Sequence, residues 1–181
     1  MKEAHATTDA ARRSLGFLSL EETMALASCG VTVPDPNSVL VSPGVILGAG
    51  VVLWPNVILQ IPAEGGIAIG AGSAVFPGTR IVASGGSIAV GSDVEIGEEG
   101  GFTIKAESGD MIEIGDGARL LGGGSLARSN RIGRGAQIIG PIRCQNCRLG
   151  DGGTGAPLAA RLAVRRTWIE PVPPASGPLS R

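Results

Sequence analysis

The chain has 181 residues, enough for one domain of ordinary size, and its formal net charge is −1. Apolar residues make up 43% of it but aromatic residues only 3%, so a core has to be built from aliphatic side chains. The balanced charge excludes a broad basic surface for nucleic acid or anionic lipid. The sequence contains no run of about 18 apolar residues, so no membrane partner is expected.

Residues 1–16 are polar, and we expect them to form a flexible N-terminus. They contain no apolar segment of the secretory type, so no export signal is expected. The three cysteines, Cys29, Cys144 and Cys147, are too few for a disulfide framework. These features together predict a cytoplasmic protein.

Residues 17–30 predict a short helix. Ser19 is a good N-cap, and Glu22 stands three positions later, as in a capping box. Gly30 is a natural end point for the helix. Two prolines follow within six residues and favour extended backbone.

A six-residue repeat begins at Val41 and continues to Ile139. An aliphatic residue opens each unit and glycine often follows it. A short fixed period with one apolar position is typical of a parallel β-solenoid, in which three units make one coil. We therefore predict an all-β, single-stranded parallel β-helix of about six coils over residues 31–152. The side chains expected to point inward are Leu47, Leu53, Ile69, Val75, Ile81, Val90, Ile96, Ile114, Leu120, Leu126, Ile132 and Ile138.

Interruptions of the repeat indicate where loops leave the coil. The strongest aliphatic–glycine pairs are Leu47–Gly48, Ile69–Gly70, Val90–Gly91, Ile114–Gly115 and Ile132–Gly133. Their spacings are 22, 21, 24 and 18 residues, so 4, 3, 6 and 0 residues exceed a coil of eighteen. The extra residues lie near 63–66, 84–86 and 107–110, each shortly before an aliphatic pair. We expect these loops to stack on one corner, where solenoids usually carry function.

Residues 153–181 differ in composition from the repeat, with five of the twelve prolines and four arginines against one glutamate. Pro157 is suited to a helix start, and a short helix after it would cap the open end of the last coil. A solvated tail is the equally weighted alternative.

The run Val41–Ile139 resembles the hexapeptide-repeat acyltransferases, whose fold is a left-handed parallel β-helix. Within Phe17–Gln60, the predicted helix and the phrase GVTVPDPNS that follows it carry a second resemblance. They are similar to the linker helix and first coils of the bifunctional N-acetylglucosamine-1-phosphate uridyltransferase/glucosamine-1-phosphate acetyltransferase family. This resemblance implies a homotrimer, acetyl-CoA or another acyl-CoA as donor, and a sugar or nucleotide-sugar as acceptor.

The catalytic histidine of that family has no counterpart in the repeat, because the only histidine is His5. A carboxylate with a raised pKa can replace histidine as a base, and Glu98, Glu99 and Glu107 are the candidates. Five further residues are candidates for substrate binding, although each also fits a solvated turn or face. They are Glu64, Asp110, Arg128, Arg131 and Arg134.

Other chemistry-bearing residues are assigned structural or incidental roles. His5 lies in the polar N-terminus, away from the coils. No metal site is expected, because the γ-carbonic-anhydrase zinc site of this fold needs three histidines. Cys144 and Cys147 form a lone C-x-x-C, which favours ordinary cysteines over zinc or redox chemistry. Trp54 follows an inward position, so we expect it to point outward as a trimer contact.

Two functions remain open at this stage. The first is acyl transfer to a sugar or nucleotide-sugar, with a carboxylate in place of the histidine. The second is a non-catalytic trimeric solenoid that binds a partner or a small ligand at the loop corner. The missing histidine favours the second function, and the family resemblance favours the first.

Overall fold

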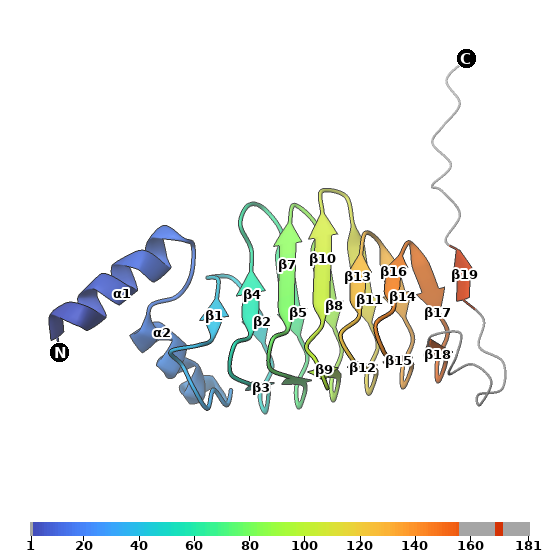
Figure 1. Cartoon of the computed structure of the whole chain (residues 1–181), viewed down its shortest axis with the longest axis horizontal. Helices are drawn as coiled ribbons and strands as arrows, with labels where there is room; N and C mark the ends of the chain where they lie inside the picture. The colour runs from blue at the N-terminus through green and yellow to red at the C-terminus, as the bar shows by residue number, and fades with distance from the viewer. Residues whose placement is uncertain (1, 156–168, 172–181) are drawn as a thin grey trace, which may run out of the picture.

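The computed structural model describes residues 2–155 and 169–171 and shows a parallel β-solenoid (Figure 1). Each turn contributes one strand to each of three sheets. Sheet B contains β1 (Leu40–Val41), β4 (Ile58–Gln60), β7 (Arg80–Ser84), β10 (Thr103–Glu107), β13 (Ser125–Ala127) and β16 (Arg143–Gln145). Sheet C contains β2 (Ile46–Leu47), β5 (Gly66–Ile69), β8 (Ser87–Val90), β11 (Met111–Ile114), β14 (Asn130–Ile132) and β17 (Cys147–Leu149). Sheet A contains β3 (Val52–Leu53), β6 (Ala74–Val75), β9 (Glu95–Glu98), β12 (Arg119–Leu121), β15 (Gln137–Ile139) and β18 (Thr154–Gly155).

The architecture confirms the predicted all-β solenoid, and it fits a left-handed β-helix. The described residues make about five turns, slightly fewer than the six coils expected from the repeat. No helix among the described residues is long and apolar enough to cross a membrane.

The core is a stack of aliphatic side chains inside the coil. Eleven of the twelve predicted inward residues are buried, and Leu47 is partly buried against the same core. Sheet C buries a second residue per strand that the repeat did not single out, namely Ile67, Ile88 and Ile112. One coil cannot bury such side chains alone, so stacking of successive coils is what stabilises the fold.

The N-terminal part covers the first coil with helices. The predicted capping box is confirmed: Ser19 caps α2 (Leu20–Ala25), with the Glu22 N–H donating to its side chain and the Glu22 carboxylate accepting from the Ser19 N–H. A 3-10 helix, η1 (Leu26–Cys29), follows and ends at Gly30, whose φ is +78°. The first segment differs from the prediction, because it forms helix α1 (Lys2–Ser14) where a flexible N-terminus was expected.

One buried arginine explains why the end of α1 is ordered. The Arg12 side chain is only 6% exposed. Its guanidinium donates to the Leu18 and Val39 carbonyl oxygens at 2.8 and 2.7 Å and to the Thr23 hydroxyl at 3.0 Å. Because these partners belong to α2 and to the chain entering the first coil, Arg12 ties three segments together. The composition of residues 1–16 concealed this role, since arginine is usually exposed.

At the other end, β19 (Ile169–Pro171) pairs antiparallel with β17. The predicted capping helix of the C-terminal tail falls on residues 156–168, which lie outside the described residues.

The predicted loop corner is present between sheets B and C. The connectors 61–65, 85–86 and 108–110 all leave a sheet B strand and enter a sheet C strand. Figure 1 shows them along the upper edge, rising over β4, β7 and β10 and dropping abruptly at β13. We call this edge the B–C corner. We call the ledge the step at this corner between the β10–β11 connector and the shorter β13–β14 connector of the next coil.

Candidate functional site

The ledge arises because one coil is longer than the next at the B–C corner. The buried residue Ile112 follows Ile104 by eight positions, whereas their partners on the next coil, Asn130 and Leu126, are only four positions apart. The long connector therefore overhangs the short one. Beneath it is a cavity of about 200 Å³. Its lining residues are Lys105, Glu107, Asp110, Ala127, Arg128 and Gln145.

Three predicted site residues, Glu107, Asp110 and Arg128, come together in this cavity. Asp110 braces the overhang: its Oδ2 accepts from the Glu107 N–H at 3.0 Å, and its Oδ1 accepts from the Ser129 hydroxyl at 3.5 Å. Arg128 occupies the tight turn below, with a φ of +62°. The ledge therefore combines two carboxylates with one guanidinium around a small polar cavity.

Glu107 differs electrostatically from the base that the sequence suggested. Its carboxylate accepts a hydrogen bond from Lys105 Nζ at 2.7 Å. This hydrogen bond, the positive charge of Lys105 and that of Arg128 lower the pKa of Glu107. A base near neutral pH needs a raised pKa, so desolvation is not the dominant effect here. In this arrangement Glu107 is an ionised acceptor.

Glu98 and Glu99 lie at a different corner from the other carboxylates, and the expectation that all extra residues share one phase is wrong. Ile96 pairs with Val75, and Ile104 pairs with Ile81. Ile81 follows Val75 by six positions, whereas Ile104 follows Ile96 by eight. Two of the six extra residues in this coil therefore lie between sheets A and B. Spacing along the chain alone does not distinguish the two corners.

The remaining carboxylates of the prediction are separated from the ledge. Glu98 accepts from Arg119 at 3.2 Å, and the same guanidinium bonds Glu95 at 2.5 Å on the outer face of sheet A. Glu99 is exposed in a turn with a φ of +61°. Glu64 is exposed in the connector 61–65, on the B–C corner but outside the ledge cavity.

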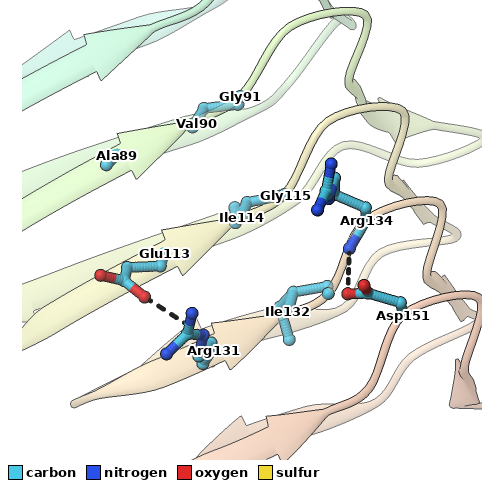
Figure 2. Close-up of a pocket in the computed structure, with 11 residues that line it drawn as sticks. Ala89, Val90, Gly91, Glu113, Ile114, Gly115, Arg131, Ile132, Arg134 and Asp151 are labelled. Carbon is cyan, nitrogen blue, oxygen red and sulfur yellow. Dashed lines mark hydrogen bonds and ion pairs between the residues drawn. The ribbon is translucent and has the colours of Figure 1, made fainter.

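A second, larger hollow lies on the outer face of sheet C (Figure 2). It has a volume of about 410 Å³ and runs from β8 to the turn after β17. We call it the sheet C groove. Its lining residues are Ala89, Val90, Gly91, Glu113, Ile114, Gly115, Arg131, Ile132, Gly133, Arg134 and Asp151.

Glycine makes the groove possible at its edge toward sheet A. Gly91, Gly115 and Gly133 stand one above the other, and a Cβ added to Gly115 would lie 2.6 Å from the Arg134 nitrogen. The coils approach so closely here that no side chain fits between them. The groove floor is therefore backbone, and charged side chains rise only at its margins.

Two of the predicted arginines line this groove. Arg131 Nε lies 3.4 Å from Glu113 Oε2 on the neighbouring strand. The Arg134 N–H donates to Asp151 Oδ1 at 2.9 Å. Figure 2 shows the Arg134 side chain extending away from the Asp151 carboxylate. The groove thus offers one guanidinium engaged with a carboxylate and one directed elsewhere, which suits an anionic ligand group.

A third hollow, of about 240 Å³, lies beside the groove on sheet C. Glu113 and Arg131 line both this hollow and the groove, and Met111 and Ser129 place it directly under the overhang. Arg148 lies in register with Arg131 on the last coil and is exposed. The last coils therefore present Arg131, Arg134 and Arg148 along the hollows of sheet C, next to the ledge.

Sequence reasoning missed Lys105, Glu113, Arg148 and Asp151. Glu113 carries a usable signal, since it is the residue before an inward isoleucine and must point outward from a strand. Lys105 stands between Ile104 and Ala106, which are both buried, so it also points outward from its strand. The role of Asp151 was not detectable, because it depends on a hydrogen bond to the preceding coil.

The other residues that the sequence drew attention to lie apart from these hollows. His5 is in α1. Trp54 points outward as predicted, is 40% exposed, and stacks on Phe76 with ring centroids 6.0 Å apart. Cys144 is buried and Cys147 partly so, and both thiols are free. Over the described range, no group of three or more histidine, cysteine or acidic side chains converges in a way that could hold a metal.

Comparison with known proteins assigns no family to the chain. No family model matches it, and the curated proteins include no match either. The fold is nevertheless compatible with a hexapeptide-repeat β-helix. Function must therefore be inferred from the surface that the coils present.

Proposed function

We propose that the chain is a hexapeptide-repeat transferase-like protein that binds an acyl-CoA and a sugar or nucleotide-sugar on the surface between the ledge and the sheet C groove. The observation that carries the proposal is the groove of about 410 Å³ lined by Arg131 and Arg134. Acyl-CoA and nucleotide-sugars both carry phosphate groups, and arginine binds phosphate with two parallel hydrogen bonds.

Acyl transfer also requires a group that accepts the proton of the attacking hydroxyl or amine. Among the carboxylates first considered, Glu107 is the one next to this surface, and Asp110 holds its backbone in place. Its lowered pKa disfavours a base role in the free protein. Catalysis by Glu107 would therefore require the ligand to displace Lys105, which raises the proton affinity of the carboxylate.

The lowered pKa of Glu107 favours a second candidate function, a non-catalytic binding solenoid. A carboxylate that is held ionised by Lys105 can accept a hydrogen bond from a sugar hydroxyl without any chemistry. In this case the ledge recognises the sugar and the groove recognises the phosphate. Either function suits a homotrimer, in which the flat outer faces and the exposed Trp54 would lie against neighbouring copies.

Thermal unfolding with and without ligand tests the binding proposal. Acetyl-CoA or UDP-N-acetylglucosamine, each added well above its dissociation constant, should raise the melting temperature by mass action. The variant Arg134→Gln should lose most of this shift. Arg143→Gln is the matched control, since Arg143 is exposed on the outer face of sheet B, outside the groove. Equal shifts in both variants, or no shift with either ligand, would contradict the proposal.

An assay of free CoA separates the two functions. Transfer of the acetyl group releases the CoA thiol, which a thiol reagent detects, and Glu107→Gln should abolish this release while preserving the thermal shift. A protein that binds both ligands and releases no thiol is the non-catalytic solenoid. Light scattering gives the mass of the assembly in the same samples, and a monomer would exclude the trimeric site.

A further inference from the structure

Cys144 and Cys147 occupy the B–C corner of the last coil. Cys144 is in β16, Cys147 begins β17, and only two residues separate them. Asn146 makes the turn between the strands with a φ of +51°, in the left-handed region. Such a residue bends the chain sharply from sheet B into sheet C, so the ends of the two strands lie close together.

The two thiols face the same space from different depths. Cys144 stands in register with Leu126 in the inward column and is 7% exposed. Cys147 is partly buried against the same core, and it lies close enough to Cys144 to contribute to the raised pKa of the Cys144 thiol. The two sulfur atoms are therefore neighbours in the folded protein.

The partners of Cys147 fix its position. Its N–H donates to Asn130 Oδ1 at 3.1 Å, and its Sγ donates to the Gln145 carbonyl oxygen at 3.2 Å. Asn130 is itself buried and donates to the Ala127 carbonyl oxygen at 2.8 Å. Asn130 of the preceding coil thus holds Cys147 in place, and Cys147 is the more exposed of the two cysteines.

We propose that Cys144 and Cys147 are a redox-active dithiol, which a small-molecule disulfide of the glutathione type oxidises to an intrachain disulfide. The geometry assigns distinct roles. Cys147 is the more accessible thiol and reacts first, whereas Cys144 is shielded and resolves the intermediate. Burial, together with the neighbouring Cys147, raises the pKa of the Cys144 thiol to about 11, which agrees with its reacting second.

The reaction proceeds by two thiol–disulfide exchanges. The Cys147 thiolate attacks one sulfur of the small disulfide, forming a mixed disulfide and releasing the first small thiol. Cys144 then loses its proton to solvent and attacks Cys147 Sγ, which releases the second small thiol. The chain gives up two protons and two electrons in total, and the small disulfide takes up both.

This inference does not depend on the proposed ligands, although the two sites adjoin. Gln145, inside the C-x-x-C turn, lines the ledge cavity, and Arg148, immediately after it, lines the hollow under the overhang. Closing the disulfide would constrain the turn that positions both side chains. The oxidation state of the dithiol would then modulate the ledge whether its function is catalytic or not.

The test incubates the full chain with glutathione mixtures from fully reduced to fully oxidised, then alkylates the remaining thiols and locates them by peptide mass spectrometry. We expect Cys144 and Cys147 to lose alkylation together, in one peptide that has lost two hydrogen atoms. Cys144→Ser should instead retain glutathione on Cys147, because no resolving thiol remains. Cys147→Ser should leave Cys144 alkylated only after unfolding. Cys29→Ser, at an exposed cysteine outside the coil, is the matched control and should behave as the wild type.

Two outcomes would overturn the proposal. One is a wild-type protein that keeps glutathione on Cys147 as stably as the Cys144→Ser variant. The other is a native chain that stays reduced in oxidised glutathione alone while the same chain in denaturant is oxidised. Because the denatured sample shows that the thiols and the reagent are competent, a negative result with native protein is informative.

Discussion

Two corners of the solenoid differ in the length of their connectors and in how closely successive coils pack there. Between sheets C and A, the connectors 48–51, 70–73, 91–94, 115–118 and 133–136 all have the same length. Each begins with a glycine on which a Cβ would lie less than 3.0 Å from the backbone of the next coil. At the B–C corner the connectors vary in length, and side chains line the ledge cavity beneath the connector 108–110.

The comparison teaches where this fold tolerates change. The corner between sheets C and A has no spare volume, so its composition is dictated by the contact between coils. The B–C corner lies on the outside of the stack, where a connector can lengthen without separating the coils. Candidate ligand and redox chemistry therefore gathers at the second corner and on the adjoining face of sheet C.

The largest loss of stability is expected from a charge placed among the aliphatic side chains inside the coil. Ile114→Asp would bury a carboxylate without a partner, which costs on the order of 5 kcal/mol and rivals the whole free energy of unfolding. We expect the variant not to fold, as circular dichroism would show. Met111→Asp is the matched control on the same strand, because Met111 is 56% exposed and should accept the change. Equal stability of the two variants would refute the inward register.

A smaller loss of stability should distinguish the close packing at the corner between sheets C and A from the looser B–C corner. Gly115→Ala places a Cβ 2.6 Å from the Arg134 nitrogen, and the coils must move apart to accept it. We expect a loss of about 2–3 kcal/mol in urea denaturation. Gly66→Ala, at the B–C end of β5, has no atom within 4 Å of the added Cβ and should be neutral or slightly stabilising. A neutral Gly115→Ala would show that the coils are not in tight contact.

The sequence predicted the part of the fold that repeats. Leu53, Ile96 and Leu120 could be placed inside because a fixed period and stacking leave one arrangement for them. The loop corner could be predicted for the same reason, since residues in excess of the period must leave the coil. Arg12 could not be predicted, because its burial depends on carbonyl oxygens contributed by separate segments.

The candidate site was only partly predictable, for a related reason. Glu107 and Asp110 lie at the loop corner, where the extra residues were expected, whereas Glu98 and Glu99 lie between sheets A and B. A surplus of six residues in one coil does not reveal that it is divided between two corners. Only strand register resolves the division, and register depends on contacts between coils that the chain order does not contain.

Asp116, at the corner between sheets C and A, and Asp110, at the B–C corner, accept hydrogen bonds from different parts of the chain. Asp116 Oδ1 accepts from the Ser92 N–H of the preceding coil at 2.8 Å. Asp110 accepts from the Glu107 N–H of its own coil at 3.0 Å, and its contact with the Ser129 hydroxyl of the next coil is longer, at 3.5 Å. Asp116→Ala should therefore destabilise the fold by about 1 kcal/mol, and Asp110→Ala by less. Hydrogen exchange gives the sharper readout, since the Ser92 amide should lose protection only in the first variant. Loss of Ser92 protection in both variants would contradict this division of roles.

The smallest effect concerns the charge at the ledge. Lys105 lowers the pKa of Glu107 below its ordinary value of 4.5. The interaction therefore stabilises the folded protein at pH values above 4.5, and this stabilisation is lost as the pH falls through the pKa of Glu107 in the folded state. Lys105→Met should raise the pKa of Glu107, followed by NMR of its side-chain carboxyl carbon. Arg119→Gln, on sheet A, is the control and should leave Glu107 unchanged. Because both partners are exposed, the change in overall stability should be too small to detect, and only the titration of Glu107 itself should move. An unmoved Glu107 in Lys105→Met would mean that the ledge carboxylate is not held by Lys105 and is free to act as a base.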